Sequence, residues 1–183
     1  PEAVVAPERA AAVADPEIVE IFTEEAAEVL ETIAAQLPLW RSAPASGAPL
    51  AELRRAFHTL KGSGRMVGAG LIGDLSWSAE HLLNRVIDGG LDASPAVVEA
   101  VERAQWQLPA LVQAFAGGTA VDEVAVRTLQ SAIDAVTRGE APQWVHAPVE
   151  APEERLPAAQ PQGPVAEEVL PEVAAAQAQE GLP

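Results

Sequence analysis

Apolar residues recur at helical spacing along most of this chain, and no segment shows the alternation of a convincing strand. Asp15, Pro16 and Glu17 form a strong helix start, with a capping acid, a proline at the first helical position and an acid favoured by the helix dipole. Pro38 is expected to end this helix, because its ring clashes with the carbonyl group of Ala34. The predicted apolar stripe consists of Ile18, Phe22, Val29, Ile33 and Leu37.

The next two helices are predicted to form a hairpin. The second helix should run from about Pro49 to Val67, followed by a turn at Gly68, Ala69 and Gly70. The third helix should span about 71–88, with Leu71, Leu75, Ala79, Leu82 and Val86 facing inward. Because the connection is short, the two helices should pack as antiparallel neighbours.

Two more helices complete the predicted fold. Ser94 and Pro95 repeat the pattern of a cap followed by proline and open a fourth helix, which Pro109 should kink or break. Thr119, with Asp122 three residues later, resembles a capping box that opens a fifth helix. The pattern therefore predicts an all-α protein, an antiparallel up-down four-helix bundle with an additional C-terminal helix.

The composition changes at both ends of this helical region. Residues 140–183 contain eight prolines, eight glutamates and one arginine, without a sustained apolar period. Such a segment cannot bury enough apolar surface to offset the entropy lost on ordering, so we interpret it as a disordered linker. Residues 1–14 are also interpreted as a linker, which leaves 15–139 as the folded bundle. Two linkers and a first residue other than methionine suggest a fragment of a longer, multidomain protein.

The net charge of −16 and the absence of cysteine exclude several kinds of protein. An acidic chain is a poor ligand for nucleic acid, whose phosphate groups attract clustered positive charge. Without cysteine there is neither a disulfide framework nor a thiolate site. The chain has no run of eighteen apolar residues and no signal peptide, so we expect a cytoplasmic domain that does not bind membranes and is monomeric in isolation.

One short segment departs from this acidic character. Four of the eleven basic residues lie within twelve positions and form a basic strip, namely Arg54, Arg55, Lys61 and Arg65. Lys61 is the only lysine of the chain. His58 lies within this strip, beside the apolar helix face of Leu53, Phe57 and Leu60. Since phosphate oxygens pair with basic side chains, a histidine in this setting is suited to hold a phosphoryl group.

The predicted hairpin brings a carboxylate to this histidine. His58 lies eleven residues before position 69 and Glu80 lies eleven residues after it, so the two should be at similar heights. A carboxylate that accepts a hydrogen bond from Nδ1 fixes the imidazole tautomer and leaves Nε2 as the free nucleophile. We expect Glu80 to be exposed and to tune His58 without stabilising the fold. Gly62, one turn after His58, removes a side chain where a partner must come close.

The sequence gives little support for a metal site, a catalytic serine or a nucleotide-binding loop. His81 should pack or face solvent, and His146 lies in the predicted linker. The three histidines do not have metal-ligand spacing, and there is no nucleophile elbow or phosphate-binding glycine loop. We therefore expect no metal, no cofactor and no ATP site in this chain.

The segment from His58 to Ser63, followed by the Gly68–Ala69 turn and a helix with Leu75 and Glu80, resembles the histidine phosphotransfer (HPt) family. The resemblance is closest to the phosphorylatable domains of CheA-type chemosensory kinases, particularly hybrid kinases that control type IV pili. It implies that His58 is phosphorylated on Nε2, that Glu80 orients it and that Lys61 stabilises the phosphate. Trp77 departs from the pattern, because the CheA subclass can have a second histidine there.

Two functions remain open from the sequence. In the first, His58 accepts a phosphoryl group from a histidine kinase catalytic domain or a receiver, and passes it to an aspartate of a response-regulator receiver. In the second, the bundle docks a receiver or scaffold without being phosphorylated. Either partner should lie over the second and third helices, in contact with Arg54, Gly62, Ser63 and Arg65.

Overall fold

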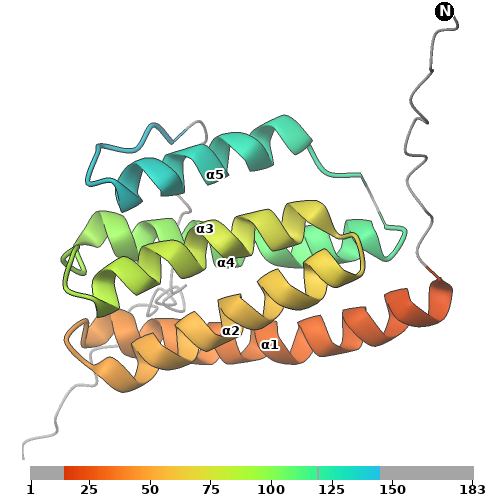
Figure 1. Ribbon diagram of the computed structural model, residues 1–183, viewed down its shortest axis with the longest axis horizontal. Helices are drawn as coiled ribbons and strands as arrows, with labels where there is room; N and C mark the ends of the chain where they lie inside the picture. Colours follow the sequence, from red (N-terminus) through yellow and green to blue (C-terminus); the bar gives the residue numbers. More distant parts are fainter. Residues whose placement is uncertain (1–14, 119, 145–183) are drawn as a thin grey trace, which may run out of the picture. The chain divides into compact units, whose positions relative to one another are not determined.

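The computed structural model describes residues 15–118 and 120–144. These residues contain five helices: α1 (Pro16–Ser42), α2 (Gly47–Met66), α3 (Gly70–Ile87), α4 (Pro95–Phe115) and α5 (Glu123–Thr137). The prediction of an all-α bundle with an additional C-terminal helix is confirmed (Figure 1). The predicted linker of residues 1–14, residues 145–183 of the second predicted linker, and His146 lie outside the described residues.

The first four helices form a closed ring of neighbours. Helix α1 packs against α2, α2 against α3, α3 against α4, and α4 returns to α1. Helix α5 packs against both α3 and α4, as the uppermost helix in Figure 1. Each helix thus buries one apolar stripe against two or more others, which is why an amphipathic pattern suffices to specify the bundle.

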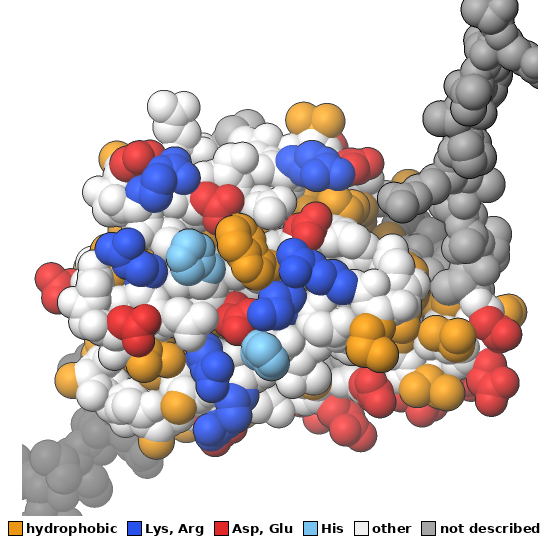
Figure 2. Space-filling view, viewed as in Figure 1, with side chains coloured by type: hydrophobic (Ala, Val, Ile, Leu, Met, Phe, Trp, Pro, Cys, Tyr) orange, Lys and Arg blue, Asp and Glu red, His pale blue; other side chains and the backbone are white. Residues whose placement is uncertain are grey.

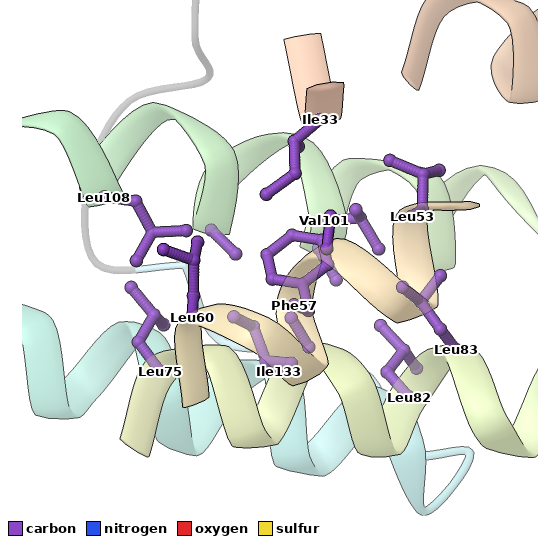
Figure 3. Packing of buried hydrophobic residues seen from close by; sticks show 14 of the residues in the cluster. Ile33, Leu53, Phe57, Leu60, Leu75, Leu82, Leu83, Val101, Leu108 and Ile133 are labelled. Atoms are coloured by element: carbon purple, nitrogen blue, oxygen red, sulfur yellow. The ribbon is translucent and has the colours of Figure 1, made fainter. Parts of the chain in front are cut away.

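The core is built from the stripes of all five helices. Phe57 of α2 is fully buried and lies among side chains of the other helices, including Ile33, Val101 and Ile133 (Figure 3). The Phe22 ring of α1 meets the Phe115 ring of α4 edge to face, with 5.3 Å between the centroids. Because Phe57 is fixed in this core, its neighbour His58 is held at the surface of α2.

Helix α1 is longer than its sequence predicts. It begins as expected, with the Asp15 side chain accepting a hydrogen bond from the Glu17 N–H at 3.0 Å. Pro38 does not end it, and the helix continues to Ser42. Proline removes one backbone hydrogen bond, but the continued helix buries Trp40 completely, which offsets that loss. Ile18, expected in the core, is instead 47% exposed.

Two further helix predictions are corrected. Pro109 does not break α4, which continues to Phe115 and buries Leu111 and Val112 beyond the proline. The predicted capping box is wrong, because Asp122 itself caps α5 by accepting a hydrogen bond from the Ala125 N–H at 3.1 Å. Thr119 lies outside the described residues. Packing of the apolar residues decides where these helices run, more than the local preference of proline.

The bundle does not end at residue 139. The segment after α5 brings Trp144 against the core, where its ring lies 4.6 Å from the guanidinium carbon of Arg103. Arg103 is itself buried and donates two hydrogen bonds to Glu99, at 3.0 and 2.8 Å. The residues that pack against the core therefore include Trp144, which lies beyond the end of α5.

Removal of residues 140–144 should therefore destabilise the bundle. Compared with a protein of residues 15–144, residues 15–139 should lose about 1–2 kcal/mol, the typical value of a desolvated cation–π contact. The melting temperature, followed by circular dichroism, should fall by several degrees. Trp144→Ala in residues 15–144 should reproduce most of the loss. Equal melting temperatures for all three proteins would mean that Trp144 merely rests on the surface.

Candidate functional site

His58 and Glu80 are in direct contact across the α2–α3 hairpin. His58 Nδ1 lies 2.8 Å from Glu80 Oε1, as the symmetry about residue 69 predicts. The hairpin forms because Gly68 adopts the left-handed conformation, with φ of 83°, and reverses the chain. The His58 side chain is 60% exposed, so a partner can reach the ring.

Glu80 is buried, in contrast to the expectation from the sequence. Only 6% of the residue is exposed, and its second oxygen, Oε2, lies 2.6 Å from Lys61 Nζ. Burial raises the pKa of Glu80, but hydrogen bonds from Lys61 and His58, together with the positive charge of Lys61, outweigh it and hold this pKa below its usual value. Glu80 is therefore an ionised carboxylate between the two side chains of α2.

The ionised carboxylate fixes the tautomer of the histidine. Because Glu80 can only accept hydrogen bonds, the proton of the neutral imidazole is on Nδ1. Lys61 Nζ is 3.4 Å from Nδ1, but two donors do not bond each other, so its partner is the carboxylate. The unprotonated Nε2 has no hydrogen-bond partner among the described residues and is a free nucleophile.

This arrangement predicts that acid destabilises the wild-type protein more than a variant that lacks the Glu80 carboxylate. A depressed pKa means that Glu80 stabilises the fold fully above its usual pKa of 4.5, and that this contribution is lost as the pH falls through the lower value of the folded state. Glu80→Gln mimics the protonated acid. The difference in unfolding free energy between wild type and Glu80→Gln, measured with urea, should therefore shrink from pH 7 to about pH 3. An unchanged difference would mean that Glu80 is not an ion pair partner.

The rest of the basic strip is partly neutralised by neighbouring acids. Arg55 pairs with Glu52 on the same helix, and Arg65 pairs with Asp74 of α3 at 3.2 Å. Arg54 has no ion-pair partner in the described part of the chain. Figure 2 shows basic side chains and both described histidines together on one face, while acidic side chains gather toward the lower right edge. This face therefore presents positive charge beside His58 on an otherwise acidic protein.

Gly62 leaves open space on the surface of α2 next to this site, because it has no side chain. It lies within α2, is exposed, and a Cβ atom built there would meet nothing within 4 Å. Glycine in a helix costs about 0.5–1 kcal/mol relative to alanine. Because a Cβ atom would clash with no neighbour, packing does not explain why this position is glycine. Ser63 beside it is half-buried and donates its hydroxyl proton to the Thr59 carbonyl at 3.0 Å.

Sequence reasoning missed two apolar features of this region. Ile18 and Ile21 of α1 and Met66 of α2 are 47%, 51% and 89% exposed and line a groove of about 200 Å³ that also includes Ser63. Trp77, three residues before Glu80, is 40% exposed, and its ring centroid lies 5.4 Å from that of His81. The apolar stripe predicted from the sequence places Ile18 in the core and does not include Ile21, whereas both side chains are exposed.

The described residues contain no cluster of three or more potential metal ligands. No helix within the same residues combines the length and hydrophobicity that crossing a bilayer requires.

Comparison with known proteins identifies the family and a structure of similar fold. The model of the Hpt domain family matches residues 17–138. Among solved structures, the chain is similar to the phosphorylated P1 domain of CheA3, crystallised in complex with CheY6 from R. sphaeroides. That match has a TM-score of 0.62 and 24% identity, and covers 68% of this chain and 98% of the other, so the likeness concerns the fold. A comparison with curated proteins found no match.

Proposed function

This chain belongs to the Hpt family of histidine phosphotransfer domains, and on that premise we propose that its phosphoacceptor is Nε2 of His58. The observation that carries the proposal is the hydrogen bond of 2.8 Å between His58 Nδ1 and the buried carboxylate of Glu80. It leaves an exposed, unprotonated Nε2 on a basic face. His81 is also exposed, but its ring lies beside the Trp77 ring and forms no ion pair with a carboxylate in the described part of the chain.

The proposed step is a phosphoryl transfer without a proton change at Nε2. The Nε2 lone pair attacks phosphorus, a P–N bond forms, and the bond from phosphorus to the leaving oxygen of the donor breaks. The ring then carries positive charge, which the Glu80 carboxylate stabilises through Nδ1. In the reverse sense, an aspartate oxygen of a receiver attacks the phosphorus and Nε2 leaves with its lone pair.

We assign Lys61 two roles. In the unphosphorylated domain it pairs with Glu80 at 2.6 Å and keeps that buried carboxylate ionised. After phosphorylation, its flexible four-carbon stem lets the ammonium group turn toward phosphate oxygens near His58. The side chain is 21% exposed, which leaves it a path to the solvent side of the ring.

The proposed partners are a receiver domain and a histidine kinase catalytic domain. A receiver presents an acidic pocket with a divalent cation around its aspartate, and Arg54, with no ion pair in the described residues, is available to the surrounding acids. Arg65 can add to this attraction when it leaves Asp74. Gly62 and Ser63 let the partner approach, and the exposed Ile18, Ile21 and Met66 supply apolar contact.

Substitutions of Gly62 should separate stability from docking. Gly62→Ala should stabilise the bundle by about 0.5–1 kcal/mol, because helix propensity improves and a Cβ meets no neighbour. Gly62→Gln should leave the fold intact but slow transfer to a cognate receiver at least tenfold, because the longer side chain stands where the partner approaches. Small phosphodonors should still reach His58 in both variants. Unchanged transfer to the receiver in Gly62→Gln would place the partner on another face.

We further propose that the domain acts in a cytoplasmic hybrid kinase of the type that controls type IV pili. Support comes from the resemblance over residues 50–88, and the Pro- and Glu-rich composition of residues 145–183 suits a linker between domains. Loss of pilus-driven surface motility in a strain carrying His58→Gln, with normal protein levels, would support this assignment. Normal motility in that strain would contradict it.

The alternative is a bundle that docks a receiver without accepting phosphate, which the basic face would also serve. Incubation with the histidine kinase catalytic domain and labelled ATP decides between the two. Acid-labile, alkali-stable label on the wild-type chain is expected for phosphohistidine. Binding to a receiver without any label, from the kinase or from phosphoramidate, would favour the docking module.

A further inference from the structure

Two glycines fix the distance between α2 and α3. Gly64 and Gly73 are both buried at the contact of these helices. A Cβ atom at Gly64 would lie 3.2 Å from the Gly73 nitrogen and 3.5 Å from the Ala69 carbonyl oxygen. A Cβ atom at Gly73 would lie 2.8 Å from Arg65 Cγ and 3.4 Å from the Lys61 carbonyl oxygen. The two backbones therefore approach closely enough that a Cβ atom at either position would force neighbouring atoms to move.

This close approach is specific to these two positions. Gly47, Gly62 and Gly70, which also belong to α2 or α3, would meet nothing within 4 Å if they carried a Cβ atom. Within α2 and α3, steric need for glycine is thus limited to the place where α3 touches the backbone of α2. One of the touching atoms is the carbonyl oxygen of Lys61, a residue of the candidate site.

The contact lies within two turns of the His58–Glu80 pair on each helix. Gly64 is six residues after His58 and Gly73 is seven before Glu80, about 9 and 10 Å along the two axes. Since helices move as stiff units, a shift at the glycines is transmitted to the pair. The distance between His58 Nδ1 and Glu80 Oε1 is 2.8 Å, and a contact of about 3.6 Å is no longer a hydrogen bond. A shift of a few tenths of an ångström would therefore lengthen and weaken this hydrogen bond, and a separation of about 0.8 Å would break it.

We propose that Gly64 and Gly73 are positioning residues for the phosphoacceptor: their contact holds α2 and α3 close enough for Glu80 to fix the tautomer of His58. The inference rests on the proposed function of His58, but its first readout does not require phosphorylation. It gives the two buried glycines a role distinct from that of Gly62, which concerns access by a partner.

Nitrogen-15 NMR of the imidazole tests the geometry directly. In the wild type, His58 should be mostly the Nδ1–H tautomer. Gly64→Ala should shift the population toward Nε2–H, as should Glu80→Ala, while Gly47→Ala, at a helical glycine with open space around it, should leave the spectrum unchanged. The wild-type tautomer in a folded Gly64→Ala protein would overturn the proposal. If Gly64→Ala does not fold, Gly73→Ala tests the same contact from α3, with the same expected and contradicting results.

Phosphorylation by phosphoramidate provides the second readout. Gly64→Ala should slow labelling at least fivefold, and Gly47→Ala by less than twofold. In a Glu80→Ala background, Gly64→Ala should cause less than a further twofold change, because the carboxylate that it displaces is already absent. Equal losses in both backgrounds would show that the glycine acts on the fold as a whole and would overturn the proposal. A wild type that takes up no phosphate contradicts the proposed function, whereas the tautomer measurement still decides this inference.

Discussion

Replacement of His58 with glutamine should abolish phosphorylation while the bundle stays folded. His58 is 60% exposed and its neighbour Phe57 makes the core contacts, so the change removes the nucleophile without a cavity. Glutamine is also a good helix former. Labelling by the kinase catalytic domain with labelled ATP should fall to background, and the helical circular dichroism signal should be unchanged.

The matched control for this experiment is His81→Gln. His81 lies on the neighbouring helix α3, is exposed, and contacts Trp77 instead of a carboxylate. This variant should be labelled at the wild-type rate. Label that persists in His58→Gln and disappears in His81→Gln would move the acceptor to α3.

Loss of the carboxylate should have the second largest effect. Glu80→Ala should slow phosphorylation of His58 by roughly ten- to a hundredfold, at the low end of what a positioned acid or base contributes. Two changes cause this: the tautomer is no longer fixed, and the charge that forms on the ring is no longer stabilised. Labelling from phosphoramidate measures the effect without a docking step. A wild-type rate would make Glu80 a bystander.

Glu80→Ala should also destabilise the bundle, by about 1–3 kcal/mol, because a buried ion pair loses one partner. Lys61 limits the loss, since its 21% exposed side chain can turn to solvent. Lys61→Met is the informative companion, because it removes the charge and keeps the apolar stem. It should leave Glu80 buried with only His58 as partner, so that urea unfolding at pH 7 detects a loss of similar size.

The helical fold and the contact between His58 and Glu80 were accessible from the sequence, because both depend on local spacing. Amphipathic periodicity and the Asp15–Pro16 start predict helices directly, and the short turn at Gly68 makes α2 and α3 antiparallel. The contact between His58 and Glu80 followed from counting residues on each side of that turn. Helix geometry is regular, so equal counts give equal heights.

The errors arose where tertiary packing outweighs local preference. Pro38 and Pro109 should end or break helices by themselves, yet burial of Trp40 and of Leu111 carries both helices onward. Ile18 belongs to an apolar stripe by spacing, but α1 extends beyond the neighbours that would cover it. The residues after 139 read as linker by composition, although Trp144 finds a partner in Arg103, a residue about forty positions away.

What the sequence determined by itself was the set of helices, the hairpin and the histidine with its basic strip, since each depends on residues close in the chain. Only the tertiary structure decided that Glu80 is buried and ionised, because its burial and pKa depend on Lys61 and His58 of another helix. The tertiary structure also gives the glycines of α2 different surroundings. Gly62 faces open space, whereas Gly64 lies against the backbone of α3, a difference set by the distance between two helices.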